Sequence, residues 1–352
     1  MHEHRFAVCA EAFSRGLQLS DQELEYAALL KRRHLVSTCF EWGCRIATVS
    51  ALLFLAVLLA GVVYQAWGWL DVQFLTGFDS RRPANAGLLA GIWGTFWLIL
   101  FTTIFTVPMG VGAAIYLEEY ASDNRLTRLI KLNLSNLAGV PSIVYGMLGV
   151  TAFVRMFGLI SAADGLIWSI SLGFGTLEIP LPLGRCLLAG SFTLSLLILP
   201  VVIIASQEAL RAVPPSIRHA SYALGATEWQ TIRHQVLPAA VPGIATGIIL
   251  ALSRAMGETA PLIMIGALTY LAFSPGNLNN PMEAFQDPQR VLDAPFDMFT
   301  SMPIQIFNWV GQPKAEFQNV AAAGSLVLLI LLVVFNATAI VIRNRAQKRI
   351  TW

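Results

Sequence analysis

Two charged residues stand alone inside a long uncharged stretch of the sequence. Arg254 and Glu258 are four positions apart, and about 20 residues on either side carry no other charge. On a continuous helix this spacing would put both side chains on one face. A charged side chain at the centre of a membrane costs roughly 2.5 to 3.5 kcal/mol, so both must face the protein interior or a water-filled path.

Two interpretations of this pair are open. Arg254 and Glu258 can neutralise each other and fix helix packing, or Arg254 can bind an anion. A guanidinium offers a fork of donors that matches phosphate oxygens, and it stays charged at every relevant pH. Glu258 would then hold the fork and accept a hydrogen bond from a protonated oxygen of hydrogen phosphate. The hydroxyls of Thr259 and of Ser142, beside Pro141, are further candidate donors.

The composition indicates that these residues lie in a membrane protein. Only 12% of the 352 residues are charged, 56% are hydrophobic, and the mean hydropathy is +0.63. A soluble globular chain usually has about one quarter charged residues. The net charge of +2 and four cysteines without paired spacing exclude a strongly basic nucleic-acid binder, an acidic disordered chain and a secreted disulfide scaffold.

Six stretches are long and apolar enough to cross about 30 Å of hydrocarbon as helices. They run approximately over 46–67, 88–116, 132–153, 186–206, 238–262 and 320–342. Placing both termini in the cytoplasm puts most of the Lys and Arg residues on the cytoplasmic side, as the positive-inside rule requires. Spans two to five contain prolines, which predict kinked helices: Pro108, Pro141, Pro200, Pro242 and Pro261. Gly243 and Gly247 have the spacing of a close helix-packing motif.

The cytoplasmic loop over residues 207–237 carries its own pattern. Pro214 and Pro215 suit the first turn of a helix that Gly225 would end, and Thr227 with Gln230 forms a capping box for a second helix. This helix, glycine turn and helix present apolar and aromatic residues where water is expected. We expect such a surface to be buried, either against another part of this chain or against another subunit.

Four separated motifs resemble a known family. The loop from His219 to Trp229, followed by Leu237-Pro238, resembles the "EAA" loop of ABC-importer permeases. The stretches 254–262, 139–146 and 302–309 narrow the resemblance to PstA-type permeases of phosphate ABC importers, from about residue 74 to the sixth span. The resemblance implies an all-helical, six-span permease of the type I ABC importer fold, and it identifies Arg254 and Glu258 as the phosphate-binding positions.

The resemblance also implies partners. The loop would dock into a cytoplasmic ATPase through the following residues: His219, Ala220, Ser221, Leu224, Gly225, Ala226, Thr227 and Trp229. His219-Ala220-Ser221 stands where the consensus has Glu-Ala-Ala, so this chain has no carboxylate at that position. The expected partners are a PstC-like second permease, two PstB-like ATPase subunits and a PstS-like binding protein outside. ATP and Mg would sit on the ATPase, with no cofactor in this chain, which would be a transporter subunit and not an enzyme.

The expected organisation follows from these segments. A cytoplasmic arm (1–43) precedes the first span (44–69), the permease domain (70–342) with a long outer loop (270–317), and a basic cytoplasmic tail (343–352), all in a prokaryotic inner membrane. The sequence has no ATP-binding phosphate loop, so energy must come from another polypeptide or an ion gradient. Two alternatives stay open: a permease for molybdate, sulfate or a phosphonate, and a proton-coupled transporter in which Glu258 titrates.

Overall fold

The structure is a computed structural model that describes residues 21–159, 166–171, 176–271, 273, 275–277 and 288–347. It divides into two compact units, residues 1–61 and 62–352. The described part of the first unit is one helix, α2 (Asp21–Ala66), whose last residues belong to the second unit. The sequence predicts a cytoplasmic arm (1–43) and a separate first span from residue 44, but α2 runs from the arm into the span without a break. No proline interrupts this helix, and its two glycines, Gly43 and Gly61, cost only about 1 kcal/mol each.

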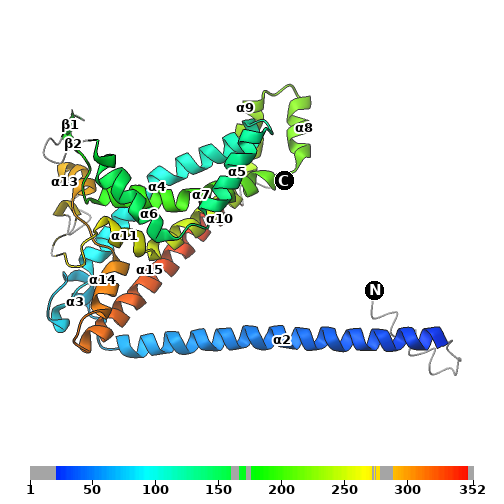
Figure 1. The fold of residues 1–352 in the computed structure, drawn as a ribbon, viewed down its shortest axis with the longest axis horizontal. Helices are drawn as coiled ribbons and strands as arrows, with labels where there is room; N and C mark the ends of the chain where they lie inside the picture. Colours follow the sequence, from blue (N-terminus) through cyan, green and yellow to red (C-terminus); the bar gives the residue numbers. More distant parts are fainter. Residues whose placement is uncertain are drawn as a thin grey trace. The chain divides into compact units, whose positions relative to one another are not determined.

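The second unit is built almost entirely of helices. In chain order its elements are α3 (Val72–Thr76), η1 (Pro83–Asn85), α4 (Leu89–Ile115), η2 (Tyr116–Tyr120), α5 (Arg125–Leu137), α6 (Ser142–Gly149), η3 (Val150–Val154), η4 (Met156–Gly158), β1 (Leu166–Ser171), β2 (Thr176–Leu181), α7 (Leu187–Arg211), α8 (Pro215–Ala223), α9 (Glu228–Thr231), η5 (Ile232–Val236), α10 (Leu237–Gly257), α11 (Ala260–Ile265), η6 (Pro275–Asn277), α13 (Pro288–Asp293), η7 (Ala294–Phe296), α14 (Met302–Val310) and α15 (Glu316–Gln347). Within this unit α8 and α9 lie at one end, and the hairpin of β1 and β2 lies at the other (Figure 1).

Five helices among the described residues are long and apolar enough to cross a membrane, and they match five of the six predicted spans. The third predicted span is not one helix. It consists of α5 and α6 with its continuation η3, which meet at an angle of 105°. Pro141 has no N–H to donate and pushes Val140 out of the helical region, so the helix stops and restarts. The Tyr145 hydroxyl donates to the Leu137 carbonyl at 2.8 Å and joins the two sides of the bend.

Helix α7 is the centre of the bundle and packs against both α4 and α10 (Figure 1). A Cβ on Gly243 would lie 2.8 Å from the Ala209 Cβ, and one on Gly247 would lie 2.4 Å from the Ala205 Cβ. Four small residues therefore let α10 and α7 approach closely, as the glycine spacing predicts. Ile198 and Val202 of α7 are fully buried in a core cluster that includes Leu252 of α10.

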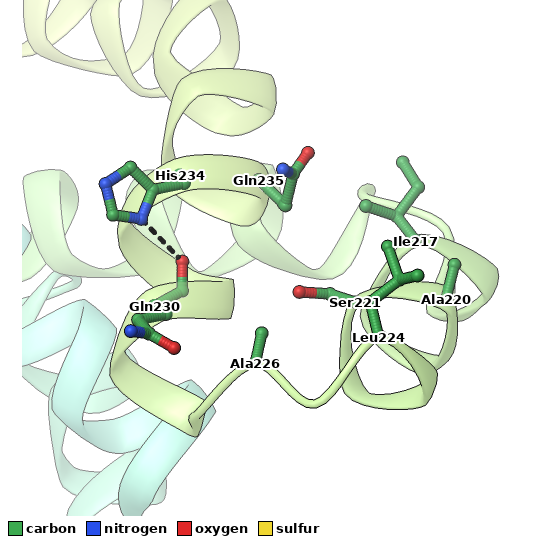
Figure 2. A pocket seen from close by; sticks show the side chains of 8 residues that line it. All are labelled: Ile217, Ala220, Ser221, Leu224, Ala226, Gln230, His234 and Gln235. Atoms are coloured by element: carbon green, nitrogen blue, oxygen red, sulfur yellow. Dashed lines mark hydrogen bonds between the residues drawn. The ribbon is translucent and has the colours of Figure 1, made fainter.

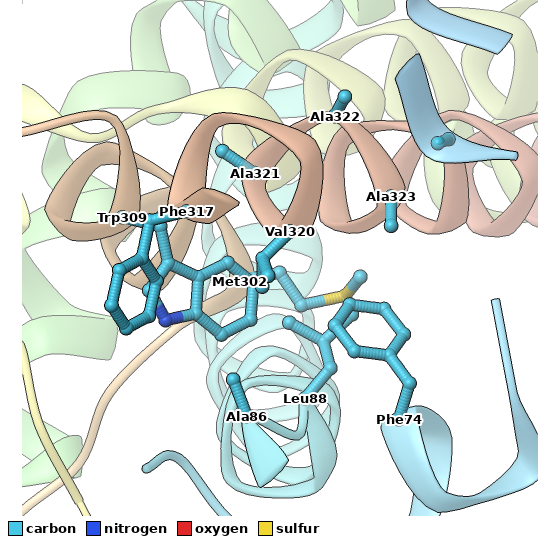
Figure 3. Close-up of a cluster of buried hydrophobic side chains, with 11 residues drawn as sticks. Phe74, Ala86, Leu88, Met302, Trp309, Phe317, Val320, Ala321, Ala322 and Ala323 are labelled. Carbon is cyan, nitrogen blue, oxygen red and sulfur yellow. The ribbon is translucent and has the colours of Figure 1, made fainter. Parts of the chain in front are cut away.

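The described part of the predicted outer loop folds against the bundle. Figure 3 shows Met302 and Trp309 of α14 packed with Leu88 at the start of α4, Phe74 of α3 and Phe317 of α15. The backbone N–H of Met302 donates to the Thr95 hydroxyl at 3.0 Å, and the Gln305 amide donates to the Gly87 carbonyl at 2.8 Å. Apolar burial and polar contacts together hold α14 against α3, the start of α4 and the start of α15.

The antiparallel hairpin of β1 and β2 is an element that the sequence analysis does not anticipate. Leu166 pairs with Leu181, and Ser171 pairs with Thr176. Strand β2 leads through residues 182–186 to α7, so the hairpin belongs to the connection between the third and fourth spans.

Candidate functional site

The predicted charge pair lies at a break in the fifth span. Helix α10 ends at Gly257, and the Glu258 backbone is extended, with φ −77° and ψ 124°. The expectation that Arg254 and Glu258 share a face of one continuous helix is therefore wrong. Their side chains nevertheless meet across the helix end, with Arg254 Nε 3.4 Å from Glu258 Oε1. Gly257 favours the stop, and the helix resumes as α11, in which Pro261 occupies the first turn.

The two members of the pair are exposed to different degrees. The Arg254 side chain is 52% exposed, whereas that of Glu258 is 17% exposed. A guanidinium held by one 3.4 Å contact keeps most of its donors free for another partner. Within the described residues, no other acid pairs with Arg254. The arrangement presents a permanent positive charge beside a carboxylate at a helix break, where unpaired backbone groups also gather.

The break in the third span lies against the break in the fifth. Helix α6 packs on α11 so closely that a Cβ on Gly146 would lie 2.8 Å from the Pro261 Cα. Ser142 is the first residue of α6, and Thr259 directly precedes α11; both are half-buried. Neither hydroxyl is hydrogen-bonded to Arg254 or Glu258 among the described residues. The structure thus brings two of the predicted motifs together without connecting their hydroxyls to the pair.

Neighbouring polar residues of α10 are used in helix packing. The Ser253 hydroxyl lies 2.7 Å from the Ile249 carbonyl and also contacts the side-chain oxygen of Asn336 in α15. Arg343 of α15 donates to the Thr246 hydroxyl at 2.9 Å. These contacts hold α10 to α15 and leave Arg254 as the half-exposed cation of the segment.

The predicted docking loop has the expected form of helix, glycine turn and helix. Helix α8 ends before Gly225, whose φ of +82° is a left-handed conformation that glycine adopts without strain. The capping box is present, because the Thr227 hydroxyl accepts from the Gln230 N–H and the Gln230 side chain accepts from the Thr227 N–H. The Leu224 side chain is 89% exposed, and Tyr222 and Trp229 are also exposed.

A hollow of about 570 Å³ opens between the two arms of this loop (Figure 2). Its lining consists of Ile217, Ala220, Ser221, Leu224, Ala226, Gln230, His234 and Gln235. Four of the predicted docking residues thus line one concave surface. The hydroxyls of Ser221 and Thr231 lie 2.8 Å apart and hold α8 to α9. His219 is exposed and does not line the hollow.

Comparison of the sequence and the fold with known proteins shows the family of this chain. The profile of the family described as "Binding-protein-dependent transport system inner membrane component" matches residues 106–352. The chain belongs to this family. It is an ABC importer permease, and the predicted family, transmembrane character and permease fold are confirmed, although the fold is mostly rather than entirely helical because it includes the hairpin of β1 and β2.

Individual relatives agree over most of the chain. A phosphate transport system permease protein PstA 1 of Mycobacterium tuberculosis (strain CDC 1551 / Oshkosh) is 32% identical and covers 86% of this permease and 86% of its own length. A probable ABC transporter permease protein YqgI of Bacillus subtilis is 29% identical over 87% of this chain and 92% of its own. The solved bacterial ABC transporter involved in import of the acidic polysaccharide alginate matches with a TM-score of 0.53 and 16% identity, over 92% of this chain and 98% of that one.

One cluster of charged residues in this permease is missed by the sequence analysis. Glu118 and Glu119, at the end of the second span, form ion pairs with Lys131, Arg211 and Arg218. Two adjacent acids at the end of an otherwise uncharged span are the signal that could have indicated it, because such a position needs cationic partners.

Proposed function

We propose that this permease moves inorganic phosphate, and that Arg254 binds the anion during its passage. The observation that carries the proposal is the half-exposed guanidinium at the helix break, held on one side by Glu258. Its free donors match two phosphate oxygens, and the single long contact to Glu258 is weak enough to rearrange when an anion arrives. Relatives named as phosphate transport system permeases support this choice of anion.

Glu258 supplies discrimination in this proposal. A carboxylate beside the anion site repels a fully deprotonated oxyanion, but it accepts a hydrogen bond from the hydroxyl of hydrogen phosphate. Sulfate and molybdate carry no such proton near neutral pH. Thr259 and Ser142 are placed near the two breaks and are proposed as secondary donors that act when the helices around the breaks move.

Energy is proposed to enter through the loop of α8 and α9. Its exposed Leu224, Tyr222 and Trp229 would be covered by a cytoplasmic ATPase, which binds ATP and Mg. A second, PstC-like permease would complete the path beside Arg254, two PstB-like ATPase subunits would drive it, and a PstS-like protein would deliver the anion from outside. Both termini would then lie in the cytoplasm of a prokaryotic cell. Family membership leaves the proton-driven alternative without support.

The decisive experiment is uptake of labelled phosphate by vesicles that contain the purified permease with its second permease subunit, its ATPase and its binding protein. Competition by sulfate, molybdate and a phosphonate then tests the choice of anion. The proposal expects ATP-dependent uptake that excess sulfate or molybdate leaves unchanged. If one of these anions abolishes phosphate uptake, that anion is the substrate. If uptake occurs without added ATP and an uncoupler stops it, an ion gradient and not the ATPase drives transport.

A further inference from the structure

Two adjacent carboxylates join four elements at the end of the second span. Glu118 and Glu119 lie in η2, the π-helical turn that continues α4. Successive residues of a helix point about 100° apart, so the two side chains reach different partners. Glu118 accepts from both Nε (2.6 Å) and Nη2 (2.9 Å) of Arg211, at the end of α7, and from Lys131 of α5 at 3.3 Å.

Glu119 binds the first turn of the docking loop itself. It accepts from Nη2 of Arg218 at 2.7 Å and from its Nε at 3.3 Å, and Arg218 lies in α8. The same guanidinium donates to the carbonyls of Val213 (2.8 Å) and Leu210 (3.0 Å), where α7 ends. The Arg218 and Glu119 side chains are only 19% and 8% exposed, so this contact is largely shielded from water and salt.

Apolar packing of α8 against the bundle is limited. No residue of α8 is fully buried, although Ile217 packs against a neighbouring cluster. Leu224 at its far end is 89% exposed. The loop is thus tied to the bundle at the Arg218 end, whereas nearer its other end α8 is held to α9 by the contact between Ser221 and Thr231, and Leu224 is exposed to a partner.

We infer that Glu118 and Glu119 form a clamp that makes the docking loop and the second span move together, so that displacement of α8 is passed to α4. This inference rests on the proposed coupling of the loop to an ATPase. Glu119 and Arg218 are positioning residues: they act by fixing α8 and do not touch the transported anion. Glu118 extends the same link to α7 and α5.

Hydrogen exchange on the full chain in nanodiscs tests the mechanical part of the inference. In Glu119→Gln and in Arg218→Gln, the amides of α8 should exchange at least tenfold faster than in the wild type. The double variant should exchange no faster than Arg218→Gln alone, because Arg218→Gln already removes the contact to Glu119 together with those to Val213 and Leu210. Asp123→Asn is the matched control, since Asp123 is an exposed acid that lies 3.7 Å from Arg128.

The assembled transporter tests the functional part. Releasing the clamp should raise the ATP hydrolysed per anion imported at least severalfold, because loop movements no longer reach the span. A merely structural role would lower hydrolysis and import in proportion and leave that ratio unchanged. Arg218→Lys, which keeps the charge but loses the fork, should fall between the wild type and Arg218→Gln, and it replaces Arg218→Gln if that variant does not fold.

These outcomes separate the clamp from the proposed function. Unchanged exchange in α8, or faster exchange with an unchanged ratio, overturns the clamp. A wild-type complex that imports no phosphate overturns the choice of substrate, and the exchange experiment still decides whether the clamp exists.

Discussion

Replacing Arg254 with glutamine separates the two interpretations of the charge pair. The pair is a single 3.4 Å contact, and the arginine side chain is half-exposed, so it resembles ion pairs that contribute about 0 to 1 kcal/mol to stability. Arg254→Gln should therefore change the free energy of unfolding by less than about 1 kcal/mol. The loss in anion binding should be larger. Two charge-assisted hydrogen bonds at about 1.5 to 3 kcal/mol each correspond to roughly 10²- to 10⁴-fold.

The assay is ATP-dependent uptake of labelled phosphate by reconstituted vesicles, with thermal unfolding measured on the same preparation. Arg128→Gln is the control, because Arg128 is an exposed arginine of α5 whose acidic partner lies 3.7 Å away. We expect the control to transport normally and Arg254→Gln to fold normally without measurable uptake. Wild-type uptake by Arg254→Gln would refute the role of the guanidinium. A large fall in melting temperature with a proportionate fall in uptake would show that the pair serves helix packing.

Three further predictions concern other parts of the chain. Gly225→Trp should fold, at a cost of about 1 to 2 kcal/mol for its positive φ, but it should no longer recover the ATPase in a pull-down. The control Gly225→Asn should still recover it. Recovery of the ATPase with Gly225→Trp would contradict docking at this loop. Tyr145→Phe should lower the free energy of unfolding by about 1 kcal/mol in thermal melts, and an unchanged value would show that the hydrogen bond to Leu137 does not support the bend. Burial raises the pKa of the Asp79 carboxyl, and a hydrogen bond from Trp309 opposes this shift. The protonated carboxyl therefore adds to the free energy of unfolding at acidic pH, and this added stability is lost as the pH rises through the raised pKa. Asp79→Asn should then be at least as stable as the wild type at neutral pH, and Asp79→Ala, which removes the acceptor of the buried Trp309 N–H, should lose about 1 to 3 kcal/mol; the reverse order would refute this account.

The prolines show how far the sequence predicts this fold. Five prolines in four spans predict kinked helices, and three of them, Pro108, Pro200 and Pro242, lie inside continuous helices. Only Pro141 and Pro261 begin new helices. In both of these cases a glycine precedes the proline by two to four residues, namely Gly139 and Gly257. A proline within a helix removes one hydrogen bond, which neighbours can replace, whereas a flexible residue before it lets the chain turn away.

The sequence predicts that the side chains of Arg254 and Glu258 meet, but not the backbone geometry that brings them together. The contact between Arg254 and Glu258 is found, although a helix end separates the two residues. The helix, glycine turn and helix of the loop over 207–237 are predicted well because their signals are local: a proline start, a glycine stop and a capping box within a few residues. Contacts such as that between Glu119 and Arg218 join positions far apart in the chain, so no local pattern reveals them.

The contact between α6 and α11 has a consequence for how the protein enters the membrane. At 1.5 Å per residue, neither Ser142–Val154 nor Ala260–Ile265 is long enough to cross about 30 Å of hydrocarbon. Gly146 has its place against Pro261 only after a much later part of the chain has been synthesised. The insertion machinery can therefore commit the long helices one by one by their hydropathy. The two short segments, Ser142–Val154 and Ala260–Ile265, cannot be inserted in this way. They reach their final positions only when α6 packs against α11, so tertiary folding completes the transport path after insertion.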